Sequence, residues 1–394
     1  MILSNRSLRV IASPIRKFAP FMKAAEERGT DVIKLHIGDP DLLPPEALLE
    51  GVRNYSEKNL PYAPSAGFPD FIGAWLKYYE DFGVKLNSEN VIATIGGTEA
   101  IQLALTVIGD SGDELLVFEP FYSGFKALAP AYGINLVPVP LRFDESFKLP
   151  SLAEMEKLIT PRTKGILIIN PDNPTGKLWS HEECTAILEL AKKHGIFVLS
   201  DETYREIVFK GEPSCLLAHP DSGDRVIIID SLSKRFSAPG ARLGALTSRN
   251  TEFMAAALKI AMARLSAPTL GQRAFIPLLT NSKEHTAKVA KEYLSRRDAL
   301  ILGLQNIPGV KWVVPNGAFY MVVKLPVDDA EKFAKFLLTD FSHEGKTVMV
   351  TPIKDFYLTP GIGHDEVRIA LVRNEKVLNE AVNLLTLALK KYNE

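Results

Sequence analysis

Short apolar runs alternate with longer amphipathic stretches between residues 90 and 248. The apolar runs are rich in Val, Ile and Leu and are bounded by Gly, Pro, Asp or Asn, a pattern that is typical of buried strands. It predicts strands at residues 90–97, 114–120, 134–140, 165–170, 196–202, 225–231 and 241–248.

The stretches between these runs have the apolar spacing of helices. They are predicted at residues 99–109, 122–132, 151–159 and 180–194. Ser180, followed three residues later by Glu183, matches a capping box at the start of the last one. Alternating strands and helices predict an α/β fold, with a mainly parallel sheet between helices. Such sheets bind ligands at the carboxyl ends of their strands.

The last quarter of the chain has a different order of elements. Helices are predicted at 283–305, 328–341 and 374–391, and strands at 319–325, 347–350 and 366–372. This α+β pattern indicates a smaller domain formed by residues 1–49 and 285–394. Residues 50–284 would then form the large domain. A length of 394 residues agrees with two domains.

Composition and charge give no reason to expect a nucleic-acid-binding, membrane or secreted protein. A formal net charge of −1 gives no electrostatic reason to expect nucleic acid or an anionic membrane as a partner. Arg6 and Arg9 interrupt the N-terminal segment, so no signal peptide is expected. No apolar run approaches the roughly 20 residues that span a bilayer. With only Cys184 and Cys215 in the chain, we expect a cytoplasmic protein, and no metal site is predicted.

Lys234 is the first candidate for chemistry. It follows an apolar strand, between Ser233 and Arg235, and Arg242 comes eight residues later. A lysine in a desolvated site beside other cations can act as a nucleophile or form an imine. The serine hydroxyls and Arg242 are groups that could hold a phosphate. Taken alone, a solvated lysine at a strand end is the simpler interpretation.

Asp201, Tyr204 and Asn173 follow two other apolar runs. A carboxylate at Asp201 could keep a pyridine nitrogen protonated and so turn the ring into an electron sink. Tyr204 would face the same side if the segment begins a helix, and Asn173 is held by a Pro-rich turn. Tyr204 and Asn173 could both bond one ring oxygen. The alternatives are a helix N-cap at Asp201 and a plain connection at Asn173.

Gly96, Gly97 and Thr98 stand at a predicted strand-to-helix junction. Free amides at a helix N-terminus and a threonine hydroxyl can bind a phosphate, although a tight turn is the more frequent explanation of such glycines. Tyr122 follows another strand and could stack on an aromatic ring. Tyr62 lies in a Pro-rich loop. Either tyrosine alone could be a packing residue.

Together these residues resemble the pyridoxal 5′-phosphate-dependent class I/II aminotransferases of fold type I. The most specific segments are NPDNPTGK, SDETYRE and SLSKRFSAPGARLG, in that order. The resemblance implies a Schiff base on Lys234, which is also the general base. It implies a pyridine contact by Asp201 and contacts to the ring's 3-oxygen by Asn173 and Tyr204.

The remaining roles are also implied by the resemblance. Residues holding the phosphate would be Gly96, Gly97, Thr98, Ser231, Ser233 and Arg242. Tyr122 matches the stacking position, and Tyr62 matches a tyrosine that reaches the neighbouring subunit's phosphate, which implies a homodimer. Arg368 would grip the substrate α-carboxylate, near the backbone of Gly38.

The substrate is less constrained than the cofactor. Ala241 replaces a common tryptophan, and TPIKDFYLTPGIG at 351–363 replaces a common loop. The chain looks similar to a bacterial aspartate aminotransferase branch, which predicts transamination between aspartate and 2-oxoglutarate. An arginine for a second carboxylate could be Arg264, Arg16 or one from a partner subunit.

Two other functions stay open at this point. A carbon–sulfur β-lyase that uses pyridoxal phosphate would share every cofactor residue. A transcription regulator that senses pyridoxal phosphate would need an N-terminal DNA-binding domain, but only 36 residues precede the segment IGDPD, without a basic recognition helix.

Overall fold

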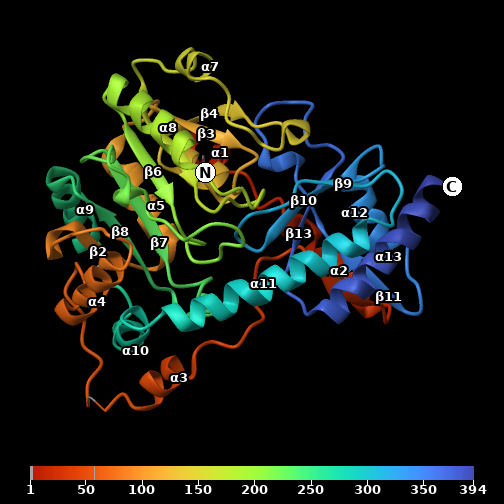
Figure 1. The fold of residues 1–394 in the computed structure, drawn as a ribbon, viewed down its shortest axis with the longest axis horizontal. Helices are drawn as coiled ribbons and strands as arrows, with labels where there is room; N and C mark the ends of the chain where they lie inside the picture. Colours follow the sequence, from red (N-terminus) through yellow and green to blue (C-terminus); the bar gives the residue numbers. More distant parts are fainter. Residues whose placement is uncertain (1–2, 57) are drawn as a thin grey trace.

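The computed structural model describes residues 3–56 and 58–394, and a seven-stranded sheet forms its larger part (Figure 1). The strand order is β2-β8-β7-β6-β5-β3-β4. β8 runs antiparallel to β2 and β7, and the other neighbouring strands are parallel. The predicted α/β fold with a mainly parallel sheet is therefore confirmed. The strands are β2 (Val91–Thr94), β3 (Glu114–Glu119), β4 (Asn135–Pro140), β5 (Thr163–Ile169), β6 (Phe197–Asp201), β7 (Val226–Ser231) and β8 (Gly244–Ser248).

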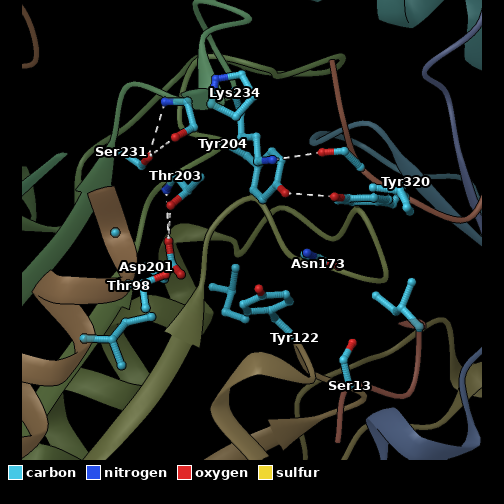
Figure 2. A pocket seen from close by; sticks show the side chains of 18 of the residues that line it. Ser13, Thr98, Tyr122, Asn173, Asp201, Thr203, Tyr204, Ser231, Lys234 and Tyr320 are labelled. Carbon is cyan, nitrogen blue, oxygen red and sulfur yellow. Dashed lines mark hydrogen bonds between the residues drawn. The ribbon is translucent and has the colours of Figure 1, made fainter. Parts of the chain in front are cut away.

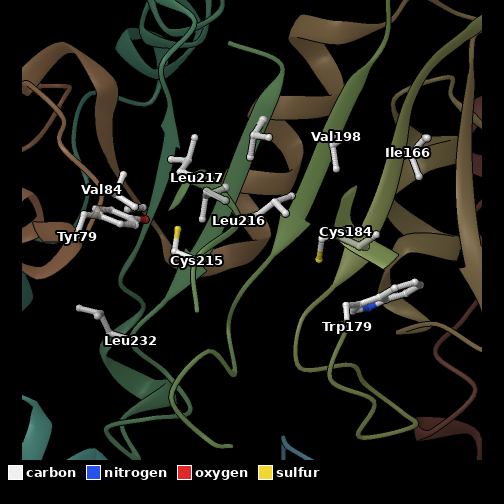
Figure 3. Packing of buried hydrophobic residues seen from close by; sticks show 14 of the residues in the cluster. Tyr79, Val84, Ile166, Trp179, Cys184, Val198, Cys215, Leu216, Leu217 and Leu232 are labelled. Carbon is white, nitrogen blue, oxygen red and sulfur yellow. The ribbon is translucent and has the colours of Figure 1, made fainter. Parts of the chain in front are cut away.

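Helices cover both faces of this sheet. The helices of this region are α3 (Glu46–Arg53), α4 (Pro69–Glu80), α5 (Gly96–Ile108), α6 (Gly124–Ala131), α7 (Leu152–Glu156), α8 (His181–His194), α9 (Thr251–Ala263) and α10 (Thr269–Leu279). Among the described residues, α3 packs on α10 rather than on a strand. One core contains residues of α5, α6 and α9, and the other contains residues of α4, α8 and α10. Figure 3 shows the second core, where Ile166 and Val198 of the sheet lie near Cys184 and Trp179. Alternate residues of one strand thus serve two cores.

Local sequence signals explain where several elements begin and end. The predicted capping box is present, since Glu183 N donates to Ser180 Oγ at 3.2 Å and Ser180 N donates to Glu183 Oε2 at 3.0 Å. The predicted strand 90–97 is too long, because β2 ends at Thr94 and Gly96 already belongs to α5. Gly96 has φ +69°, which favours glycine at this turn.

A second region contains the C-terminal part of the chain. Its four-stranded sheet has the order β12-β13-β10-β9, and a separate pair joins β1 to β11. The strands are β1 (Asp31–Lys34), β9 (Lys311–Trp312), β10 (Tyr320–Lys324), β11 (Lys346–Met349), β12 (Thr351–Pro352) and β13 (Glu366–Ala370). The helices are α2 (Ala19–Glu27), α11 (Lys283–Leu304), α12 (Ala330–Thr339) and α13 (Glu375–Asn393). Because β1 pairs with β11, the N-terminal residues return to this region.

Two features bear on the predicted domain boundaries. Helix α11 continues without a break from the large sheet to the second region (Figure 1). Helix α1 (Asn5–Arg9) lies against α6, at the large sheet. The division at residues 50 and 284 stays a prediction.

Short 3-10 helices occupy Arg16–Phe18, Ser88–Asn90, Phe143–Glu145, Leu216–Ala218, Pro239–Ala241 and Lys354–Phe356.

Several classes of feature are absent from the part of the chain that the structure describes. No helix there is long and apolar enough to cross a membrane. No group of three or more His, Cys, Asp or Glu side chains there is arranged for a metal ion. Cys184 and Cys215 are both free and buried.

Candidate active site

A cavity of about 450 Å³ lies at the carboxyl ends of the parallel strands (Figure 2). Asp201 ends β6, Ser231 ends β7, and Asn173 follows β5. The structure brings these polar residues together at one edge of the sheet. The predicted site residues that line the cavity are Gly38, Gly97, Thr98, Tyr122, Asn173, Asp201, Tyr204, Ser231, Ser233, Lys234, Arg242 and Arg368.

Lys234 lines the cavity and is half-buried. Its Nζ atom donates to the carbonyl oxygen of Gly38 at 2.8 Å. Burial lowers the pKa of Lys234 to about 8, helped by Arg368 and Arg242 and opposed by Asp39. About a tenth of the Lys234 amine is therefore neutral at pH 7, far more than for a solvated lysine. The neutral amine is the form that a nucleophile or imine former requires.

Asp201 is buried at the end of β6. Its Oδ1 atom accepts hydrogen bonds from Thr203 N at 3.1 Å and Thr203 Oγ1 at 2.6 Å. Burial raises the pKa of Asp201 to about 6 in spite of these bonds. No helix begins after Asp201, because residues 203–206 form a turn, so the helix N-cap alternative for Asp201 is wrong. Tyr204 nevertheless lines the same cavity, since the turn returns it to this side.

Hydrogen-bond donors gather at one end of the cavity. Gly97 and Thr98 belong to the first turn of α5, and Ser231 Oγ donates to Ser233 Oγ at 2.8 Å. Arg242 Nη1 donates to Pro239 O at 3.0 Å, with the Arg242 backbone in the left-handed region at φ 53°. Free helix amides, hydroxyls and a guanidinium together favour an anionic group such as a phosphate.

Two predicted residues lie outside the cavity lining. Gly96 stands beside it, and a Cβ atom there would come within 2.8 Å of Arg242 Nη2, so glycine permits the close approach of Arg242. Tyr62 is 77% exposed. Its phenol faces solvent in the single chain.

Arg368 on β13 is fully buried at the cavity wall. Its Nη1 atom donates to Asn173 Oδ1 at 2.9 Å, and its Nη2 atom donates to His36 O at 2.8 Å. Within residues 3–56 and 58–394, Arg368 has no carboxylate partner and its Nε atom has no hydrogen-bond acceptor. A buried guanidinium without a counterion is costly, so this position favours an anionic ligand.

The two candidate arginines for a second carboxylate are separated by the structure. Arg16 lines the cavity and has no ion-pair or hydrogen-bond partner for its side chain among the described residues. Arg264 does not line it. The Arg264 guanidinium instead donates to Glu99 Oε1 at 2.7 Å and to Ala93 O at 2.5 Å.

Sequence reasoning missed several lining residues, namely Ser13, Ile15, Ile37, Ile101, Ile169, Thr203, Pro239 and Tyr320. Ser13 and Ile15 come from the segment before α2, far from the other site residues in the chain. Thr203 lies in the segment SDETYRE, next to the candidate Tyr204, and this position was the available signal. Tyr320 begins strand β10 and carries a phenol, which was the available signal.

A buried ionic network lies directly behind Asp201 and Lys234. Arg205, next to Tyr204, contacts Glu202 Oε2 at 2.6 Å and Asp230 Oδ2 at 2.6 Å. Arg235, next to Lys234, contacts Asp230 and also Glu206 Oε2, the latter at 3.0 Å. The Tyr78 hydroxyl contacts both guanidinium groups. The network therefore joins the ends of β6 and β7, the two strands that carry Asp201 and lead to Lys234.

Comparisons with known proteins agree with this geometry. The sequence model of the family "Aminotransferase class I and II" matches residues 30–385. An aspartate aminotransferase of Pyrococcus horikoshii is 31% identical over 403 residues, which cover 98% of this chain and 97% of that protein.

Solved structures share the whole fold. A mutant of Thermus thermophilus aspartate aminotransferase superposes with a TM-score of 0.90 at 27% identity, covering 98% of this chain and all of that one. An alanine aminotransferase from Pyrococcus furiosus gives a TM-score of 0.90 at 30% identity, covering 99% of this chain and all of the other. The chain therefore belongs to the class I and II aminotransferases, a fold type I family that depends on pyridoxal 5′-phosphate, and it is an aminotransferase.

Proposed function

We propose that this enzyme transfers the amino group of an L-amino acid, with aspartate as the first choice, to 2-oxoglutarate. One observation supports the choice of dicarboxylates. The cavity contains two guanidinium groups, Arg368 and Arg16, that lack acidic partners among the described residues and are distinct from the donor cluster around Arg242. A substrate with two carboxylates would satisfy both.

The residues of the cavity fit pyridoxal 5′-phosphate. The residues that would hold its phosphate are Thr98, Ser231, Ser233 and Arg242, together with the amides at the start of α5, including that of Gly97. Gly96 has no side chain, which allows Arg242 to approach the start of α5 closely. The buried carboxylate of Asp201 has a raised pKa and suits a protonated pyridine nitrogen. Tyr122, 37% exposed in the cavity, would lie against the ring.

When bound, pyridoxal phosphate supplies an aldehyde for amino groups and a ring that accepts an electron pair. Arg368 would orient the substrate by its α-carboxylate, with Asn173 and the Gly38 backbone beside it. Lys234 would link the cofactor at rest and, once displaced, take the proton from the substrate Cα atom. Asp201 would keep the pyridine nitrogen protonated, while Tyr204 and Asn173 would donate to the ring's 3-oxygen.

Arg16 would bind the distal carboxylate of aspartate and 2-oxoglutarate. It belongs to the N-terminal segment, which also contributes Ser13 and Ile15 to the cavity. Because Arg16 is exposed and unpaired, it can also turn away when a neutral side chain enters. The names of relatives agree with either outcome, since they include aspartate and alanine aminotransferases.

A donor panel tests this proposal. Each amino acid is assayed with 2-oxoglutarate, and kcat/KM for aspartate is compared with that for alanine. Replacing Arg16 by Met should lower the aspartate-to-alanine ratio about 10- to 150-fold, the value of a charged hydrogen bond. Arg264→Lys is the matched control and should leave the ratio unchanged. An unchanged ratio in the Arg16 variant would remove Arg16 from the proposal.

The same panel separates transamination from β-elimination. Elimination from cystathionine would yield pyruvate and ammonia without any 2-oxo acid acceptor. We expect ammonia release to be negligible beside amino transfer. Ammonia release that exceeds amino transfer would support the carbon–sulfur β-lyase instead.

We also propose a cytoplasmic homodimer in which Tyr62 reaches the partner's cavity. Thr269 Oγ1 donates to Pro61 O at 2.7 Å, so the Tyr62 loop lies beside the segment between α9 and α10. Exposed apolar side chains here are Leu60 and Tyr62 in the loop, Met262 in the last turn of α9, and Leu265 after that helix. Water-exposed apolar groups of this kind favour a partner surface.

Sedimentation of Leu265→Glu against wild type tests the dimer. We expect the wild type to sediment as a dimer and the variant to dissociate and hold the cofactor less tightly. Lys259→Glu on α9 serves as a charge control. A monomeric wild type with full activity would rule out the shared site.

A further inference from the structure

Tyr320 lies between the two ends of the cavity, although no motif singled it out. It is the first residue of β10 and is 3% exposed. In the antiparallel pair of β10 and β13, Val322 stands opposite Arg368. Residues two apart on a strand share a face, so Tyr320 and Arg368 project from the same side of the sheet.

One phenol contacts three other residues of the cavity wall. The Tyr320 ring centroid is 4.3 Å from the guanidinium carbon of Arg368. The Tyr320 hydroxyl is 3.0 Å from the Tyr204 hydroxyl (Figure 2). It also faces Gly38, where a Cβ atom would come within 1.7 Å of it. Tyr320 therefore connects the substrate end of the cavity with the cofactor end.

The hydrogen bond between the two phenols has a direction that the ligand can set. Burial raises the pKa of Tyr204 well above its usual value near 10 and also raises that of Tyr320. Each hydroxyl thus keeps one proton at neutral pH, and either can donate to the other. If the Tyr204 hydroxyl donates its hydrogen bond to a ligand in the cavity, the Tyr320 hydroxyl must be the donor in the bond between the two phenols.

We propose that Tyr320 is a positioning residue that donates to Tyr204, so that the Tyr204 proton points at the cofactor's 3-oxygen, and that its ring holds the Arg368 guanidinium in place. This inference rests on the proposed roles of Tyr204 and Arg368. An oxygen that accepts a hydrogen bond becomes a better donor. The Tyr320 bond would therefore strengthen the donation of Tyr204 to an anionic oxygen.

Two variants separate the hydroxyl from the ring. Tyr320→Phe removes the hydroxyl and keeps the ring over Arg368. The visible absorbance of the lysine-linked cofactor, titrated with pH, should then shift its midpoint upward by about 0.5–1 unit, because the anionic oxygen loses part of its stabilisation. KM for the amino acid should stay within about twofold. Tyr320→Leu also removes the ring and should raise KM about 5-fold or more.

Tyr293→Phe is the matched control. Tyr293 is buried, its ring lies 5.0 Å from that of Phe319, and its hydroxyl has no hydrogen-bond partner among the described residues. It does not line the cavity, so the control should change neither the midpoint nor KM. Urea unfolding of each variant would show whether Tyr320→Leu is folded. If it is not folded, the spectral midpoint of Tyr320→Phe alone tests the proposal.

A midpoint in Tyr320→Phe equal to that of wild type would overturn the inference, as would an equal shift in Tyr293→Phe. The readout does not depend on the identity of the substrate. If the wild type does not use aspartate or 2-oxoglutarate, the proposed substrates fail while the spectral titration still reports on Tyr320.

Discussion

Lys234 Nζ donates to the carbonyl oxygen of Gly38 at 2.8 Å, which joins a residue after β7 to the N-terminal segment between β1 and α3. The same Gly38 faces the Tyr320 hydroxyl. The amine is therefore held toward the end of the cavity that contains Arg368. A substrate gripped by Arg368 would present its amino group and Cα atom to this lysine.

The reactivity of Lys234 should depend on pH with a midpoint near 8. Burial lowers its pKa to about 8, and only the deprotonated amine attacks an aldehyde. The rate at which cofactor-free enzyme captures pyridoxal phosphate should therefore rise through pH 8 and level off above it. Stopped-flow absorbance measures this rate.

Asp39→Asn gives an internal check on that profile. Asp39 raises the pKa of Lys234, so its neutralisation should move the midpoint below 8. A capture rate that keeps rising up to pH 10 would mean that Lys234 behaves as an ordinary solvated lysine.

Arg368→Lys should weaken substrate binding more than turnover. The Arg368 guanidinium donates to Asn173 Oδ1 and His36 O and would bond the substrate carboxylate at the same time, whereas an ammonium group cannot match this planar geometry. We expect KM for amino acids to rise about 10- to 150-fold, as for a lost charged hydrogen bond. Arg373→Lys, outside the cavity lining, is the control and should leave KM unchanged. Equal values for both variants would contradict the role of Arg368.

Asp230→Asn should destabilise the protein strongly. Asp230 is fully buried and pairs with both Arg205 and Arg235. Its neutralisation removes the anionic partner that the two buried guanidinium groups share. This loss lowers the free energy of unfolding by about 3–5 kcal/mol. The urea midpoint at one protein concentration measures this.

Glu284→Gln is the comparison for that variant. It breaks an exposed pair with Lys288, in which both side chains are more than 70% exposed, and should cost no more than about 0.5 kcal/mol. If both variants unfold at the same urea concentration, the network behind the cavity does not stabilise the fold.

The sheet and the strand-end residues could be predicted because their signals are local. A buried strand is predicted by the apolar run Ile227, Ile228 and Ile229 alone. Ser231 and Lys234 follow at the end of this strand. Parallel strands then bring such ends together without further information. The same logic placed Asp201 and Asn173 in one cavity.

Other features depend on contacts between distant segments. Arg205 and Arg235 are charged and would be expected on the surface, yet both are buried because Glu202, Glu206 and Asp230 surround them. The contact of Tyr320 with Arg368 follows from the pairing of β10 with β13.

Helix α10 shows a different limit. It contains Pro277 in its last turn, and proline usually ends a helix. Packing of Phe275 and Leu278 in the core outweighs this local signal. The sequence pattern alone predicted no helix there.

Reduction of the cofactor-loaded enzyme with borohydride, followed by tryptic digestion and mass spectrometry, tests the central claim most directly. Reduction makes the link between pyridoxal phosphate and its lysine permanent. We predict a pyridoxyl group on Lys234, and its loss, together with a fall in turnover of at least about 1000-fold, in Lys234→Ala. A pyridoxyl group on another lysine, or full activity of Lys234→Ala, would contradict the account.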